Sequence, residues 1–226
     1  MGQRGGVGRA RAVAVALTVA VAASGCAGVG SGHPDEVAPS APTWTDWGAP
    51  EGTVSFADGS ALASATEVTF ANSLGDVWDW QLVGSPDATT TSASPPVTLE
   101  MVNTGNGCRV RDERATAEGA GGDDDAASTA LVEGRLAGAR VVAGPARDLV
   151  GLGEPLGEDG PTLAVARALG QEADGSWLLV TARAFLALGV QQVLTVHCPT
   201  GEGIDLTQAQ LAMNAYTKLW GLERLP

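Results

Sequence analysis

Three strand-like segments follow one another between residues 162 and 198, and they constrain the fold more than any other part of the chain. They read TLAVARAL, WLLVTARAFLAL and VQQVLTVHC, and the turn-forming sequence EADG and Gly189 separate them. Their apolar content and short connections predict a three-stranded antiparallel meander. In the last segment, alternation places Val190, Leu194, Val196 and Cys198 on one face and Gln191, Val193, Thr195 and His197 on the other. We therefore expect a sheet with one mainly apolar face and one mixed face.

The residues before the meander also show strand patterns. Residues 97–102 alternate apolar and polar side chains, NTGNG can form a turn, and the alternation resumes at Cys108, so we expect a hairpin. Asp58 and Gly59 are expected at a second hairpin turn. Shorter strands are expected at residues 52–56, 65–70, 77–83, 139–142 and 147–152.

Two helices are expected in addition to the strands. The first follows the sequence GGDDD, with Asp125 as its N-cap and Gly138 at its end. We interpret the three aspartates as a solvated helix start, because they lack the alternating ligands and the distant glutamate of a calcium loop. The second helix is expected over residues 205–222, with Asp205 as its cap and Gln208 at the capping-box position. Its apolar stripe should lie on the sheet and consists of Ala209, Met213, Tyr216 and Trp220.

These elements predict an α+β fold, with an antiparallel β-sheet packed against two helices, one of them C-terminal. The cysteines add a constraint on its topology. Cys108 and Cys198 are the two cysteines left if Cys26 is used elsewhere, so we expect them to form a disulfide in an oxidising compartment. His197 and Cys198 would point to opposite faces of one strand, which argues against a nucleophile and base pair.

The N-terminus has the order of a secretory signal. Three arginines within the first eleven residues precede an apolar run over residues 12–23, and small residues and Cys26 follow. The sequence Ala-Ser-Gly-Cys at 23–26 resembles the lipobox of bacterial lipoproteins, although Ala23 stands where leucine is usual. This resemblance implies that the thiol of Cys26 receives a diacylglyceryl group before cleavage just ahead of it. The alternative is an ordinary secretory peptide that is cut near Ala23.

The chain therefore divides into a lipoprotein signal peptide (1–25), a lipidated cysteine with a flexible tether (26–51) and an extracytoplasmic α+β domain (52–226). The tether is rich in Gly, Ser, Pro and Ala without an apolar period, and it contains His33. Lys218 is the only lysine and Ile204 the only isoleucine, which looks like the usage of a high-GC bacterium. Together with the lipobox, this usage points to the actinobacterial cell membrane.

Four tryptophans near the start of the domain lie in two pairs. Trp44 and Trp47 stand near the end of the tether, and we expect them to dock on the domain. Trp78 and Trp80 are expected on the same side of a strand, where they form part of the core or, alternatively, stack on a ligand.

Charge and motifs exclude several functions. The chain has 13 basic and 26 acidic residues, and removal of the three arginines of the signal leaves 10 against 26, a net charge of −16. Such acidity argues against a nucleic-acid partner and against binding of anionic lipid headgroups. The sequence has no GxSxG elbow, HExxH motif, P-loop or paired cysteine cluster. We therefore predict no catalytic residues, no metal site and no cofactor.

The order of helix, antiparallel strands, long last strand and C-terminal aromatic helix resembles the PsbP-like fold of LpqN-type lipoproteins over about residues 97–225. The resemblance implies a binding or accessory protein without catalytic residues. We therefore expect a membrane-anchored, non-catalytic binding or accessory domain whose envelope protein or lipid partner is unknown. One alternative is a lipid or small-ligand carrier with an apolar pocket between the sheet and the C-terminal helix, where Ala182, Ala184, Ala209 and Ala212 would leave room. Another is a hydrolase with an unrecognised carboxylate pair.

Overall fold

The computed structural model describes residues 53–60, 62, 66–83, 97–119, 122–153 and 161–220. The expected signal peptide at 1–25, Cys26 with the tether at 26–51, and Trp44 and Trp47 lie outside these residues. No helix within the described ranges is long and apolar enough to cross a membrane.

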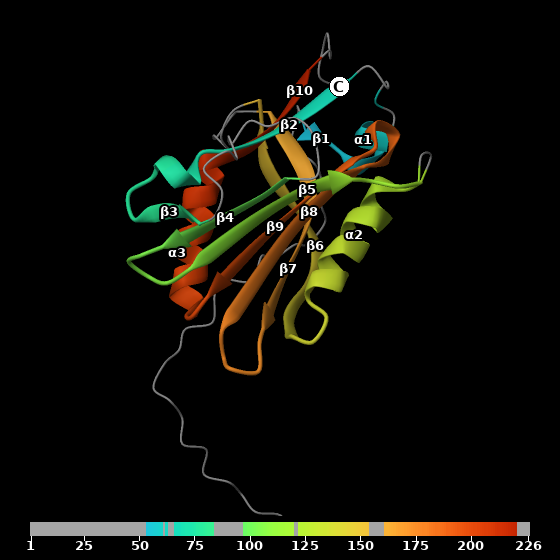
Figure 1. The fold of residues 1–226 in the computed structure, drawn as a ribbon. Coiled ribbons are helices and arrows are strands. Elements are labelled where there is room, and N and C mark those ends of the chain that lie inside the picture. Colours follow the sequence, from blue (N-terminus) through green and yellow to red (C-terminus); the bar gives the residue numbers. More distant parts are fainter. Residues whose placement is uncertain are drawn as a thin grey trace, which may run out of the picture. The chain divides into compact units, whose positions relative to one another are not determined.

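One curled sheet of ten strands makes up most of the described chain (Figure 1). Its order is β2-β10-β6-β7-β8-β9-β5-β4-β3, and β1 pairs with β7. The strands are β1 (Thr53–Val54), β2 (Glu67–Asn72), β3 (Trp80–Val83), β4 (Val97–Asn103), β5 (Arg109–Thr116), β6 (Arg140–Leu152), β7 (Thr162–Gln171), β8 (Trp177–Phe185), β9 (Val190–Cys198) and β10 (Ala215–Trp220). The helices are α1 (Phe56–Ser60), α2 (Asp124–Arg135) and α3 (Gly201–Asn214), with short 3-10 turns η1 (Leu74–Asp76) and η2 (Leu186–Leu188).

The predicted meander is confirmed. Strands β7, β8 and β9 pair antiparallel in sequence order, with Arg167 opposite Thr181 and Thr181 opposite Leu194. The predicted β4–β5 hairpin is also confirmed, and β5 then pairs antiparallel with β9. The expected class is correct in its coarser form, a sheet with helices of which the last is near the C-terminus, but the fold is richer in strands than expected.

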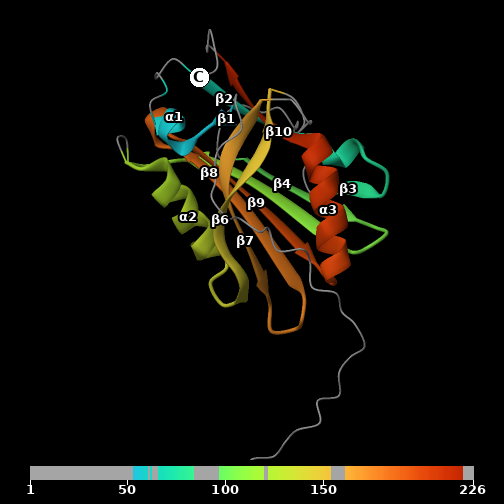
Figure 2. The same ribbon diagram turned by 180° about the vertical axis from the view of Figure 1, so that it is seen from behind.

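Helices α2 and α3 cover opposite faces of the sheet (Figures 1 and 2). Alternate residues of β8 divide between them, because Leu179 belongs to the apolar cluster that includes Ile204 of α3, whereas Val180 belongs to the cluster that includes Val132 of α2. The sheet therefore has two covered faces over its central strands.

The predicted helix over 205–222 is wrong at both ends. Helix α3 begins earlier, where the Thr200 side chain accepts a hydrogen bond from the Gly203 amide, and it ends at Asn214. Tyr216 and Trp220 then lie in strand β10, which pairs with β2 from Ala215 to Trp220 and in parallel with β6. The sequence AYTKLW fits a helical period and a strand alternation equally well, and the pairing with two neighbouring strands decides between them.

The predicted hairpin turn at Asp58 and Gly59 is also wrong, because these residues lie in helix α1. Ser55 precedes that helix, and its amide and hydroxyl both donate to the Asp58 carboxylate at 2.9 and 2.7 Å. The Asp58 amide donates back to the Ser55 hydroxyl at 3.2 Å. This reciprocal capping favours a helical turn over the hairpin turn that Asp-Gly usually forms.

Trp78 and Trp80 do not share a face. Trp78 precedes β3 and is 86% exposed, whereas Trp80 begins β3 and is only 4% exposed. Asp79 between them has a φ of 69°, which turns the chain before the strand starts. The buried indole of Trp80 donates a hydrogen bond to Gln210 of α3 at 2.8 Å, so it is a core residue that joins β3 to the helix.

The first long helix begins earlier than expected. Its N-cap is Asp123, whose side chain accepts hydrogen bonds from the amides of Asp125 and Ala126. Asp124 is fully buried, so the interpretation of all three aspartates as a solvated helix start is wrong. The two short strands expected at 139–142 and 147–152 are one strand, β6, with two register shifts against β7.

Candidate functional site

A pocket of about 440 Å³ lies between helix α3 and the face of the sheet that this helix covers. We call this face the inner face. Strands β6 to β9 form its floor and α3 forms its opposite wall. The pocket is lined by Asp148, Leu149, Val150, Arg167, Leu179, Thr181, Leu194, Val196, Asp205, Gln208, Ala209, Leu211, Ala212 and Ala215. Most of these side chains are apolar, and the polar ones are few, which is the usual composition of a small-molecule site.

The wall from α3 follows from helical periodicity. Gln208 and Ala209 both lie three or four residues from Asp205 and from Ala212, so all four residues lie on one side of the helix. Two of the four are alanines, and small side chains at these positions keep the space between helix and sheet open. The pocket therefore results from a helix that presents short side chains above its floor.

A buried ion pair lies in the floor of the pocket. Arg167 of β7 contacts Asp148 of β6, and the two side chains are only 13% and 12% exposed. The Nε of Arg167 also donates a hydrogen bond to the Thr181 hydroxyl at 3.3 Å. Burial lowers the pKa of Arg167, and the charge of Asp148 opposes that shift. The floor thus has a fixed donor and acceptor side by side among apolar residues.

The polar character of the inner face continues beyond the pocket. A smaller cavity of about 40 Å³ shares Thr181 and Leu194 with the pocket and extends to Gln192. Gln192 donates a hydrogen bond to Asp112 at 2.8 Å, and Asp112 forms a buried ion pair with Arg114 at 2.8 Å. The inner face therefore has a second buried pair of charges on β5, and strands β8 and β9 separate it from the first pair.

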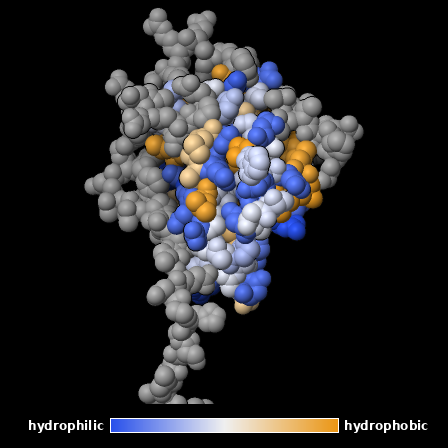
Figure 3. All heavy atoms as spheres, turned by 90° about the vertical axis from the view of Figure 1, so that its left-hand side faces the viewer, coloured by the Kyte–Doolittle hydropathy of each residue, from blue (hydrophilic) through white to orange (hydrophobic). Residues whose placement is uncertain are grey.

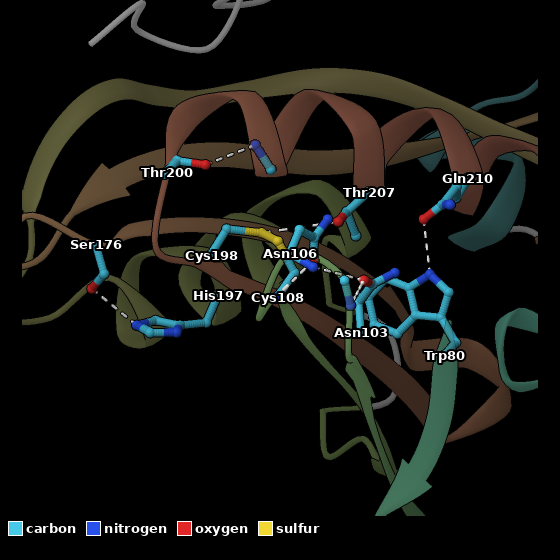
Figure 4. The surroundings of a disulfide bond; sticks show 12 residues. Trp80, Asn103, Asn106, Cys108, Ser176, His197, Cys198, Thr200, Thr207 and Gln210 are labelled. Atoms are coloured by element: carbon cyan, nitrogen blue, oxygen red, sulfur yellow. Dashed lines mark hydrogen bonds between the residues drawn. A yellow bond between two sulfur atoms is a disulfide. The ribbon is translucent and has the colours of Figure 1, made fainter. Parts of the chain in front are cut away.

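The predicted disulfide between Cys108 and Cys198 is present, and it joins the β4–β5 hairpin to the end of β9 (Figure 4). It lies beneath the first turns of α3, where a Cβ at Gly203 would lie 2.8 Å from the sulfur of Cys108. The hydroxyl of Thr207 is 3.9 Å from the sulfur of Cys198. The bridge thus ties the start of α3 to the sheet, although it does not line the pocket.

His197 points away from the disulfide, as the alternation of the strand predicts (Figure 4). Its Nε2 lies 3.0 Å from the Ser176 hydroxyl and 3.0 Å from the Glu172 carboxylate. A serine triad needs its carboxylate on the other ring nitrogen, Nδ1, so that the two nitrogens serve different partners. This cluster therefore lacks the geometry of a catalytic triad.

The four alanines that could border a pocket divide between the two faces. Ala209 and Ala212 line the pocket, as the carrier alternative requires. Ala182 instead belongs to the apolar cluster with α2, and the amide of Ala184 donates to Ser128 of α2 at 2.9 Å. Their places follow from strand alternation together with the side on which each helix lies, and the sequence does not specify that side.

The polar residues of the pocket floor were not predicted from the sequence. Arg167 interrupts the otherwise apolar run LAVARAL, and this interruption is a signal that a buried strand holds a charge for a reason. Its partner Asp148 is in a strand whose register against β7 shifts twice, so the pairing could not be derived from spacing. Among the described residues, no group of three or more His, Cys, Asp or Glu is placed to hold a metal ion.

No protein-family model matches the chain, and a search of curated proteins gives no match. The pocket and its lining are therefore the features of the chain that bear on its function.

Proposed function

We propose that the chain is a membrane-anchored envelope lipoprotein whose domain binds a small, mostly apolar ligand in the pocket beneath α3. The pocket carries this proposal, since its volume of about 440 Å³ is within the range of about 300–1,000 Å³ typical of small-molecule sites. Its lining of aliphatic residues with a few polar groups suits a ligand with an apolar body. Within the functions expected from the sequence, these features favour the small-ligand carrier.

The pocket gives less support to a hydrolase. Asp148 and Asp205 both line it, so a pair of carboxylates is available. However, Asp148 is held in an ion pair with Arg167, and a general acid for glycoside hydrolysis has to carry and release a proton. We therefore propose a binding role without catalysis.

The proposed location of the protein in the cell rests on the lipobox-like sequence at 23–26 and on the disulfide of the domain. Disulfides persist in oxidising compartments outside the cytoplasm, which agrees with an extracytoplasmic domain. Each buried methylene of a lipid contributes about 0.8 kcal/mol, and two or more chains anchor a protein stably. We propose that lipid on Cys26 holds the domain at the outer face of the cell membrane.

Labelling of growing cells with palmitate tests the anchor. We expect label in the wild-type chain and none in the Cys26→Ala variant, because that thiol is the proposed attachment site. Cys26→Ala should also move the protein from the membrane fraction to the soluble fraction. Equal labelling of both proteins would contradict the proposal.

Binding of N-phenylnaphthylamine, a neutral apolar fluorophore, tests the pocket. The full chain with Cys26→Ala serves as the background, so that the protein is free of lipid. We expect saturable binding to one site, and Ala212→Trp should weaken it by at least about tenfold, because the indole occupies the pocket.

Ala130→Trp is the matched control, since Ala130 is exposed on α2 at the other face of the sheet. It should bind the probe like the background protein, and circular dichroism should show that both variants are folded. Absence of saturable binding to the background protein, or full affinity in Ala212→Trp, would refute the pocket as the site.

A further inference from the structure

The ion pair of Asp148 and Arg167 is an unusual component of a site for an apolar ligand. Both side chains are almost completely buried, and both line the pocket. A guanidinium has five N–H donors and a carboxylate accepts on two oxygens. The contacts of Arg167 with Asp148 and Thr181 engage only part of this capacity. The pair therefore offers donors and an acceptor to a molecule in the pocket.

Stability alone gives a poor account of this pair. Removal of two charges from water costs several kcal/mol per ion, and replacing a buried pair with apolar residues of similar size is often neutral or stabilising. Around the pair the backbones are already joined, because β6 pairs with β7 without a break from Ala146 to Gly151 and β7 pairs with β8 from Ala166 to Gln171. The position of the pair in the pocket floor indicates instead that it contacts a ligand.

The charges of the pocket lining restrict the charge that the ligand can have. Arg167 and Asp148 balance each other, and Asp205 in the opposite wall adds a second carboxylate, so the lining has no surplus of positive charge to hold an anion. The fixed guanidinium in turn opposes a cation at the floor. An uncharged group that both donates and accepts hydrogen bonds satisfies Arg167 and Asp148 together without adding a charge to a buried site.

We infer that the ligand has an apolar body and an uncharged head group of this kind, such as a primary amide, which the Asp148–Arg167 pair recognises. This inference rests on the proposed function, because it assigns a ligand class to the same pocket. Hydrogen bonds to charged groups are stronger than those between neutral groups, so the head group should contribute measurably to affinity.

Displacement of N-phenylnaphthylamine by three compounds that share a naphthalene ring tests the inference. Methylnaphthalene has no head group, naphthaleneacetamide has a neutral donor and acceptor, and naphthaleneacetate is an anion. On the Cys26→Ala background, we expect the amide to displace the probe at a concentration about tenfold lower than either of the other two. The amide should lose this advantage when the ion pair is removed.

The double variant Asp148→Leu/Arg167→Met removes both charges at similar volume, so neither partner is left buried alone. In this variant the amide should displace the probe no better than methylnaphthalene does. Glu100→Leu/Arg109→Met is the matched control, because it removes an ion pair at 3.1 Å whose side chains are 38% and 59% exposed. That control should keep the preference for the amide.

The outcomes separate the inference from the proposed function. If methylnaphthalene displaces the probe but the amide is no better, or the anion is best, the inference is wrong and the pocket function stands. A preference for the amide that survives in the double variant also overturns it. If the probe itself does not bind, the proposed function fails. If the double variant does not fold, the comparison of the three compounds on the background protein still shows whether the pocket prefers the amide.

Discussion

The two covered faces of the sheet are built differently. Beneath α2, small residues alternate with the inner-face residues of β7 and β8, and Ala164, Ala166 and Ala168 pack with Val132 and Leu136 of the helix. Such small side chains let helix and sheet approach closely. The approach is close enough that a Cβ at Gly170 would lie 2.9 Å from Leu136.

Polar contacts also fix the start of α2. Asp124 accepts a hydrogen bond from the Leu186 amide at 2.9 Å, and Ser128 accepts one from the Ala184 amide. Burial raises the pKa of Asp124, while the nearby charge of Arg183, 3.6 Å away, lowers it. Burial also lowers the pKa of Arg183 to about 10. These groups are partners of one another and of the backbone, so their placement has a structural explanation.

Helix α3 is attached at its start and stands off from the sheet along one side. The disulfide and Ile204 join its first turns to the sheet, whereas Ala209 and Ala212 border the pocket. From the side that carries α3 and β3, apolar residues appear in small groups separated by hydrophilic ones, rather than as one broad patch (Figure 3). Because the same sheet packs closely under α2, the spare volume under α3 is a clue to function.

Removal of the disulfide should produce the largest difference between the two faces. Cys108 and Cys198 are 90 residues apart, and for a loop of this length the chain-entropy model gives about 4–5 kcal/mol of stabilisation. The double variant Cys108→Ala/Cys198→Ala should therefore lower the free energy of unfolding by about that amount in urea titrations.

Hydrogen exchange of the same variant locates the effect. Amides of α3 should lose protection before those of α2, because the bridge contacts Gly203 and Thr207 of α3 and no residue of α2 is among these contacts. Equal loss of protection in both helices would show that the attachment of α3 does not depend on the disulfide.

Much of the sheet was predictable because its strands have strong local patterns. The meander has long apolar segments joined by short turns, and the β4–β5 hairpin has a clear turn sequence, so pairing between neighbours in sequence could be derived. The disulfide followed from there being two cysteines once Cys26 was assigned to lipid. The strand pairings depend on residues that are near in sequence, and two remaining cysteines allow only one disulfide.

The missed features depend on contacts between distant segments. Strand β10 exists because β2 and β6 are available to pair with it, and neither lies near it in sequence. The face on which each helix lies decides that Ala212 borders a pocket while Ala182 packs beneath α2. The polar floor combines Asp148 and Arg167 across a ladder with register shifts, and alternation alone cannot predict that combination.

A matched pair of alanine substitutions gives a smaller and more specific test of the comparison. Ala166 is buried in the cluster beneath α2, so Ala166→Leu adds three carbons where no room exists and should cost about 1–3 kcal/mol. Ala212→Leu makes the same change at the border of the pocket and should alter the free energy of unfolding by less than about 0.5 kcal/mol. Urea titrations with equal m-values would show that both changes act on the folded state.

The same two variants should have the reverse order in ligand affinity. Ala212→Leu reduces the volume available to N-phenylnaphthylamine and should weaken its binding, whereas folded Ala166→Leu keeps the pocket unchanged on the opposite face. The two readouts together distinguish a cavity kept for a ligand from a defect of packing, because filling a mere defect would affect stability without affecting the probe. If Ala166→Leu lowers the free energy of unfolding no more than Ala212→Leu does, the two faces are packed alike. The pocket would then not distinguish the α3 face from the α2 face.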